Sequence, residues 1–127
     1  MGLDAEEQTG SVIGAAIEVH RALGPGFVES VYETALVVEL RHRNIPFVRQ
    51  FTVPVVYRDV EVGLHRLDLF VWDQVVVELK TVREFTPEHF AVLRSYLRAV
   101  GREHGLLLNF AKATLEIKRV QSRPLPA

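Results

Sequence analysis

The segment from Arg66 to Lys80, RLDLFVWDQVVVELK, restricts the possible folds of this chain most, because it places charges within two apolar runs. β-Branched and aromatic residues on both sides of a central Asp-Gln pair predict two β-strands joined by a tight turn. Alternation along the first strand puts Arg66 and Asp68 on one face. The same alternation puts Glu78 and Lys80 on one face of the second strand. Since a charge on a central strand costs free energy unless it is paired, bound to a metal or left in a cleft, the segment predicts cross-strand ion pairs or a chemical site.

Two helices are predicted ahead of this segment. Apolar residues at spacings of three and four indicate a helix over Ser11–Leu23, which the turn sequence Gly24–Gly26 ends. A second helix is predicted over Phe27–Arg43, and Asn44–Pro46 ends it. The polar residues 1–10 are expected to form a flexible tail.

Five strands and a third helix complete the predicted order α-α-β-β-β-α-β-β. Both faces of residues 67–71 and 75–77 are apolar, so these two strands are expected at the centre of a sheet. A meander, a crossover helix and a further strand make a mixed β-sheet flanked by helices, which is an α/β fold in the wider, α+β sense. The remaining elements are predicted at Phe47–Tyr57, Val62–Trp72, Val75–Thr81, Pro87–Val100 (the helix), Gly105–Phe110 and Thr114–Val120.

The composition excludes several classes of protein. The chain has 127 residues, 48% of them hydrophobic, and a formal net charge of −1; this predicts a single globular domain without a strongly basic surface. It contains no cysteine, so disulfides and thiolate metal sites are excluded, and a cytoplasmic location is expected. No apolar run reaches the roughly 18 residues that span a membrane, and the acidic N-terminus is unlike a signal peptide. Residues 121–127 are expected to form a second flexible tail.

The acids of the central hairpin predict a metal site. Asp68 and Glu78, brought together by adjacent antiparallel strands, offer the hard oxygen ligands that Mg²⁺ and Mn²⁺ prefer. Lys80 shares a face with Glu78, where its amine can orient a metal-bound water or stabilise a phosphorane-like transition state. This combination is typical of phosphodiester hydrolysis. Cross-strand ion pairs are the alternative, but the apolar flanks favour a buried site or a cleft.

Several segments, in order along the chain, resemble the GxxExxY family, a branch of the PD-(D/E)XK nuclease-like superfamily. The naming motif matches GFVESVY at Gly26–Tyr32, and AIEVHR at Ala16–Arg21 resembles the family's opening. The segments RLDLFV and VVELK resemble the superfamily's core signature. Later matches are SYLR at Ser95–Arg98 and GLLLNF at Gly105–Phe110. The resemblance covers residues 11–120 and implies a restriction-endonuclease-like core.

The resemblance implies a catalytic site with Mg²⁺ or Mn²⁺ as cofactor. It assigns the metal-binding acids to Glu29, Asp68 and Glu78, and the catalytic lysine to Lys80. A glutamate from the first helical segment often completes such a site, and Glu18 is the other candidate for this position. Glu29 is preferred because it shares an inward-facing helical stripe with apolar residues. Its alternative explanation is the favourable interaction of an acid with the start of a helix.

Further residues are candidates for supporting roles. His20 lies on the apolar stripe of the first predicted helix, and Tyr32 belongs to the naming motif. The alternatives are a core histidine and a half-buried tyrosine with a wet hydroxyl. Arg66, Arg94 and Arg98 are candidate contacts for the phosphates of a substrate, although surface ion pairs and a solvated helix face explain them more simply.

Val92 departs from the family, whose members usually carry a Gln at this position, four residues before the tyrosine of SYLR. Two hypotheses follow. The first is a metal-dependent nuclease acting on DNA, and the alternative is an inactive nuclease-fold module that binds nucleic acid or protein. Converging carboxylates favour the enzyme, whereas an arginine paired with each acid favours the module. The small size leaves little room for a substrate-recognition domain, and a homodimer would supply the missing surface.

Overall fold

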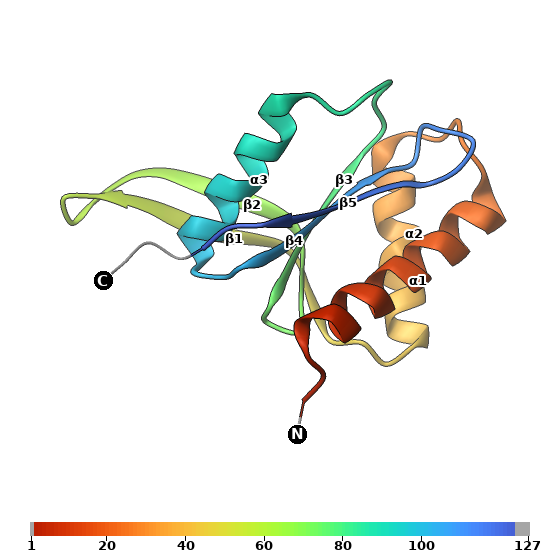
Figure 1. The fold of residues 1–127 in the computed structure, drawn as a ribbon, viewed down its shortest axis with the longest axis horizontal. Coiled ribbons are helices and arrows are strands. Elements are labelled where there is room, and N and C mark those ends of the chain that lie inside the picture. Colours follow the sequence, from red (N-terminus) through yellow and green to blue (C-terminus); the bar gives the residue numbers. More distant parts are fainter. Residues whose placement is uncertain (1, 124–127) are drawn as a thin grey trace.

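A five-stranded sheet lies between α1 and α2 on one face and α3 on the other (Figure 1). The computed structural model describes residues 2–123. No helix in this part of the chain is long and apolar enough to cross a membrane. The helices are α1 (Ala5–Leu23), α2 (Glu29–His42) and α3 (Pro87–Val100), and the strands are β1 (Phe47–Tyr57), β2 (Val60–Val71), β3 (Val75–Lys80), β4 (His104–Asn109) and β5 (Glu116–Gln121).

The strands lie side by side in the order β1-β2-β3-β4-β5. β3 and β4 are parallel, whereas every other neighbouring pair is antiparallel. The helix α3 connects β3 to β4 because a tight turn cannot join two parallel strands. The predicted order of elements and the predicted mixed sheet flanked by helices are therefore confirmed.

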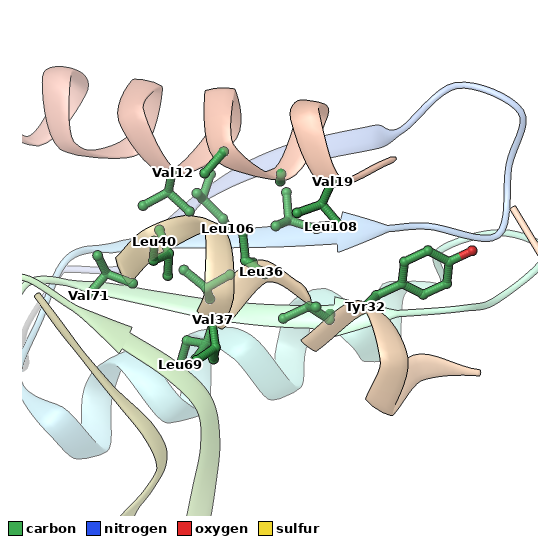
Figure 2. Packing of buried hydrophobic residues seen from close by; sticks show 14 of the residues in the cluster. Val12, Val19, Tyr32, Leu36, Val37, Leu40, Leu69, Val71, Leu106 and Leu108 are labelled. Atoms are coloured by element: carbon green, nitrogen blue, oxygen red, sulfur yellow. The ribbon is translucent and has the colours of Figure 1, made fainter. Parts of the chain in front are cut away.

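Two apolar cores lie on the two faces of the sheet. Figure 2 shows the larger core, in which α1 and α2 cover side chains of the central strands. The smaller core packs Leu93 and Leu97 of α3 against the other face. β3 contributes Val77 to the larger core and Val76 to the smaller one. Its burial on both faces explains the continuous apolar run in the sequence.

α1 begins at Ala5 rather than at Ser11, so residues 5–10 form a helix instead of the predicted flexible tail. The side chain of Asp4 accepts a hydrogen bond from the Glu7 N–H at 2.8 Å and caps the first turn. The sequence of this turn is polar, so apolar periodicity, which predicts the rest of the helix, does not reveal it.

Several further boundaries differ from the prediction by one or two residues. β2 begins at Val60 because Arg58 and Asp59, with φ of 49° and 64°, form the two-residue turn of a tight hairpin. The predicted C-terminal tail begins at residue 121, but Gln121 still belongs to β5. The parts of the predicted tails at residue 1 and residues 124–127 lie outside the described residues.

Replacing Leu108 by Ala should lower the free energy of unfolding by about 2–5 kcal/mol, because this side chain is fully buried in the larger core. The matched control is Val38→Ala on α2. Val38 is 61% exposed, so its replacement should change the free energy by less than about 0.5 kcal/mol. Chemical denaturation of both variants measures the difference, and equal losses would contradict the described packing.

Candidate active site

β2 and β3 part where their acidic residues begin. The ladder between the two strands ends at the pair Leu69 and Val77. Beyond it, the Asp68 N–H donates to Glu78 Oε1 at 3.0 Å. In return, the Leu79 N–H donates to Asp68 Oδ2 at 2.9 Å. The two carboxyl groups therefore accept backbone hydrogens that a continued ladder would have paired with carbonyl groups.

Where the strands part, Glu78 is buried and Asp68 is half-buried. Glu78 is 6% exposed, and burial raises its pKa to about 9, with a further contribution from the Asp68 charge. Burial also raises the pKa of Asp68, and the hydrogen bond from the Leu79 N–H opposes that rise. At neutral pH the protonated form of Glu78 is therefore favoured in the metal-free protein.

Glu29, the first residue of α2, lies near this pair. Burial raises the pKa of its carboxyl, repulsion by Asp68 raises it further, and attraction by Lys80 opposes both. The Lys80 ammonium acts in the same way on the two strand acids. Four residues assigned to the site from the sequence thus form one electrostatically coupled group: Glu29, Asp68, Glu78 and Lys80.

Glu18 lies apart from this group. Its carboxylate accepts hydrogen bonds from Arg21 Nη2 at 2.7 Å and Nε at 3.0 Å on the surface of α1. The hydrogen bond to Arg21 lowers the pKa of Glu18, opposite to the direction at the buried acids. Of the two candidate glutamates, the one that faces the acidic pair is therefore Glu29.

His20 is buried between α1 and the segment after β4. Its Nε2 lies 2.8 Å from the carbonyl oxygen of Lys112, and its ring centroid lies 5.9 Å from that of Phe110. These contacts tie α1 to the end of β4. They match the alternative of a core histidine rather than a residue that binds metal.

Tyr32 holds the loop that leads into α2. Its hydroxyl donates to the Gly24 carbonyl at 2.5 Å and accepts from the Phe27 N–H at 3.2 Å. The fully buried ring stacks on Phe110, with centroids 4.6 Å apart. Tyr32 therefore acts on the site through the loop that places Glu29.

The candidate phosphate contacts lie on the surface. Arg66, Arg94 and Arg98 are exposed and form no salt bridge with any residue from 2 to 123. Arg102, which follows the end of α3, instead donates to the Asp73 carboxylate at 3.1 Å. The first three side chains are thus available to an anionic ligand.

Tyr96 on α3 faces the acidic pair, although the sequence analysis does not assign it to the site. Burial raises the pKa of its hydroxyl, and the charges of Glu78 and Asp68 raise it further. Its ring centroid lies 4.5 Å from that of His65 on β2. Helical spacing carries a signal for this position, because Tyr96 follows the buried Leu93 by one turn.

Val92, the position at which the resemblance predicts Gln, is 41% exposed. Ser95 does not supply the missing polar group, because its Oγ donates to the Val92 carbonyl at 2.6 Å and lies 3.4 Å from His65 Nε2. On α3, the charges of Glu78 and Asp68 raise the pKa of Tyr96.

Glu33 is a further acid that the sequence analysis does not assign to the site. Its charge raises the pKa of both Glu29 and Asp68. It is buried, and Arg49 Nε donates to it at 2.6 Å while Gln50 Nε2 donates at 2.8 Å. Its position one helical turn after Glu29 predicts that both acids share a face of α2.

Asn109 is fully buried beside the end of β3, where it pairs in register with Lys80. Its amide accepts from the Val82 N–H at 3.1 Å and donates to the Val82 carbonyl at 2.7 Å. One side chain thus extends the pairing of β3 and β4 beyond the last ladder residue. Asn109 thereby holds the strand that carries Lys80.

A divalent cation matches the charges at this site. The three acids Glu29, Asp68 and Glu78 form no salt bridge within the described residues. Burial raises the pKa of each of these acids more than the Lys80 charge lowers it, and a bound cation would favour their charged forms. However, no group of three or more His, Asp or Glu side chains in residues 2–123 is arranged to hold a metal ion. Asp68 and Glu78 therefore fit a cation as a pair, without the convergence of three carboxylates expected for an enzyme and without the arginine pairing expected for an inactive module.

Comparisons with known proteins agree on one fold. A model of the PD-(D/E)XK nuclease superfamily matches residues 6–120, and no curated protein matches the chain. The crystal structure of SSO0001 is similar, with a TM-score of 0.58 and 19% identity over 76% of this chain and 50% of that one, so this chain spans half the length of SSO0001. An alkaline exonuclease, LHK-Exo from Laribacter hongkongensis, has a TM-score of 0.56 and 12% identity over 96% of this chain and 72% of that one.

Without metal, the protein should lose stability as the pH rises from about 5 toward 9. The pKa of Glu78 is about 9 when folded, against an ordinary value of 4.5. Across this interval the unfolded chain releases a proton that the folded protein keeps, so a rising pH favours unfolding. The stabilisation is complete below the unfolded pKa and lost above the folded one. We expect a fall on the order of 4 kcal/mol between pH 5 and pH 8, because each pH unit in this interval is worth about 1.4 kcal/mol.

The measurement is urea denaturation in EDTA at several pH values. Glu78→Gln keeps a neutral group of the same shape, so it should flatten the pH dependence and be more stable than the wild type at pH 8. Glu61→Gln changes an exposed residue and should keep the wild-type dependence. A Glu78→Gln curve parallel to that of the wild type would contradict the buried proton.

Replacing Tyr32 by Phe should lower the free energy of unfolding by about 1–2 kcal/mol, because it leaves the Gly24 carbonyl and the Phe27 N–H without their partner. Tyr57→Phe is the matched control, since Tyr57 is 62% exposed. Its replacement should cost less than about 0.5 kcal/mol. Chemical denaturation of the two variants compares them, and equal costs would rule out the proposed support of the loop.

Proposed function

The chain belongs to the PD-(D/E)XK nuclease superfamily, and on that premise we propose that it is a nuclease that hydrolyses phosphodiester bonds in DNA with Mg²⁺ or Mn²⁺ as cofactor. The observation that carries the proposal is the carboxyl pair of Asp68 and Glu78 between parting strands. A buried acid with a purely structural role is expected to be neutralised, as Glu33 is by Arg49. The strand acids have no such partner among the described residues, and a cation would supply it.

In this proposal Asp68 and Glu78 hold the cation through carboxylate oxygens, and Glu29 at the start of α2 assists. A bound divalent cation makes hydroxide available near neutral pH by lowering the pKa of a coordinated water. Glu78 must lose its proton to become a ligand, so the affinity for the cation should increase with pH.

Lys80 follows Glu78 by two residues on β3. Its ammonium orients the attacking water or stabilises negative charge that develops on the phosphate oxygens. The side chain of Asn109 is hydrogen-bonded to Val82 just after this strand. These bonds fix the end of β3 and so restrict the position of the Lys80 amine. Tyr96 approaches from α3, where its hydroxyl can donate a hydrogen bond to a substrate phosphate.

Assignment to the GxxExxY branch is part of the proposal and is supported by the motif's own contacts. Gly26 has a φ of 112°, a conformation that other residues rarely adopt. Glu29 begins α2 near Asp68, and the Tyr32 hydroxyl closes the loop that precedes Glu29. The glycine, glutamate and tyrosine of the motif thus act together to place one acid.

The DNA substrate, the cytoplasmic location and a homodimer belong to the same proposal. Arg66, Arg94 and Arg98 are exposed side chains suited to phosphates. LHK-Exo, which shares the fold, is described as an alkaline exonuclease, and an activity that increases with pH agrees with the proton on Glu78. The lack of cysteine is compatible with a reducing compartment.

An inactive nuclease-fold module is the second candidate. Two observations favour it: Val92 at the usual Gln position contributes no polar group, and the described acids do not form a three-membered metal cluster. In this case the surface binds nucleic acid or protein without cleaving it, and Asp68 and Glu78 have no catalytic role.

The test combines calorimetric titration with Mn²⁺ and cleavage of plasmid and single-stranded DNA. Wild type should bind Mn²⁺ and cleave DNA. Lys80→Ala should keep Mn²⁺ binding but lose at least about 100-fold in cleavage rate, and Glu78→Gln should lose both. Lys118→Ala, on the exposed part of β5, is the control and should retain full activity.

Wild-type protein that neither binds Mn²⁺ nor cleaves either DNA would refute the nuclease. If that protein still bound DNA in a mobility-shift assay, the inactive module would be the correct reading. Cleavage that persists in Lys80→Ala would refute the role of Lys80 while leaving a nuclease.

A further inference from the structure

The hairpin formed by the ends of β1 and β2 exposes an unusual amount of apolar surface. We call residues 54–64 the distal hairpin. Five large apolar side chains in it are each 58–62% exposed: Val56, Tyr57, Val60, Val62 and Leu64. Together they leave on the order of 500 Å² of apolar area in solvent, which is near the upper end for the largest patch of a monomeric protein.

No other part of the described chain covers the distal hairpin. Figure 1 shows it projecting beyond α3 and away from the rest of the sheet. β3 pairs with β2 only over Leu69–Val71, so residues 60–64 pair with β1 alone. An isolated two-stranded hairpin is marginally stable in water, and a third layer usually covers one of its faces.

Apolar residues occupy both faces of the distal hairpin. Partners across an antiparallel ladder share a face, so Tyr57 lies with Val60, and Leu64 lies with Pro54. Val56 is next to Tyr57 in β1 and therefore points to the opposite face. A hairpin with one solvated face would carry polar residues there, so this composition indicates an arm that another molecule covers.

We propose that the distal hairpin is the dimerisation arm of this protein and packs against the same hairpin of a second copy. A twofold contact brings identical surfaces together, so it requires a surface that complements itself. The turn meets this requirement, because it carries Arg58 beside Asp59 and Glu61, which form no salt bridge within residues 2–123. In a twofold pair the arginine of one copy can meet the acids of the other.

The exposed apolar area of the distal hairpin agrees with an interface to a second copy of the chain. A standard interface buries about 800 Å² on each partner, with an apolar centre and a polar rim. The apolar part of the arm supplies more than half of that area, and the charged turn can supply the rim. Leu64 precedes Asp68 by about 13 Å along the strand, so the dimer would carry two candidate active sites near its interface.

The inference deepens the homodimer of the proposed function, and its test measures mass by sedimentation over a range of concentrations, so its failure is distinguishable from a failure of the proposed cleavage. The wild type should form a dimer of twice 14.4 kDa. Val62→Glu and Tyr57→Glu should each raise the dissociation constant at least about 30-fold. The matched control is Val38→Glu on α2, which changes an equally exposed valine and should leave the dimer intact. Circular dichroism and thermal melting establish that each variant is folded.

Three results would overturn the proposal. The first is a wild type that stays monomeric at all concentrations; if it also cosedimented with phosphatidylglycerol vesicles, the arm would instead bind a lipid surface. The second is dimerisation that persists in both Val62→Glu and Tyr57→Glu, which would place the interface elsewhere. The third is dissociation of Val38→Glu to the same extent as Val62→Glu.

Discussion

Where β2 and β3 part, the carboxyl groups of Asp68 and Glu78 replace backbone carbonyl groups as hydrogen-bond acceptors. The rest of the site depends on these two hydrogen bonds. Glu78 accepts from the Asp68 N–H, and Asp68 accepts from the Leu79 N–H. The strands stay joined after their ladder ends, and Glu78 remains buried beside the half-buried Asp68. Burial without a cation disfavours their charged forms, which is why the pKa of each is raised. The apolar cores on both faces of the sheet offset this unfavourable burial.

Different elements position the groups around the acids. The loop closed by Tyr32 delivers Glu29 at the start of α2. The amide of Asn109 holds the strand that carries Lys80, and α3 brings Tyr96 to the same acids. Tyr32 and Asn109 are fully buried with their polar atoms hydrogen-bonded, and Tyr96 is half-buried. The arrangement therefore resembles a preorganised site more than a set of surface ion pairs.

Much of the fold could be predicted because its signals are local. β1 and α3 begin and end at the predicted residues, since strand composition, Pro87 and Gly101 act within a few positions. The start of α1 could not be predicted from periodicity, because a cap by Asp4 and not an apolar stripe begins it. In the site, the proximity of the two strand acids follows from the hairpin, whereas Tyr96 was missed because the packing of α3 decides what it faces.

The sequence by itself determined the order of elements, the central position of β3 and the presence of acids within an apolar hairpin. These follow from periodicity and turn chemistry, which act over short stretches of chain. Only the tertiary structure decided that Glu29 rather than Glu18 faces the acids, and that His20 belongs to the core. It also decided that the distal hairpin is left uncovered. Contacts between residues far apart in sequence depend on how whole layers pack, and no local pattern encodes that packing.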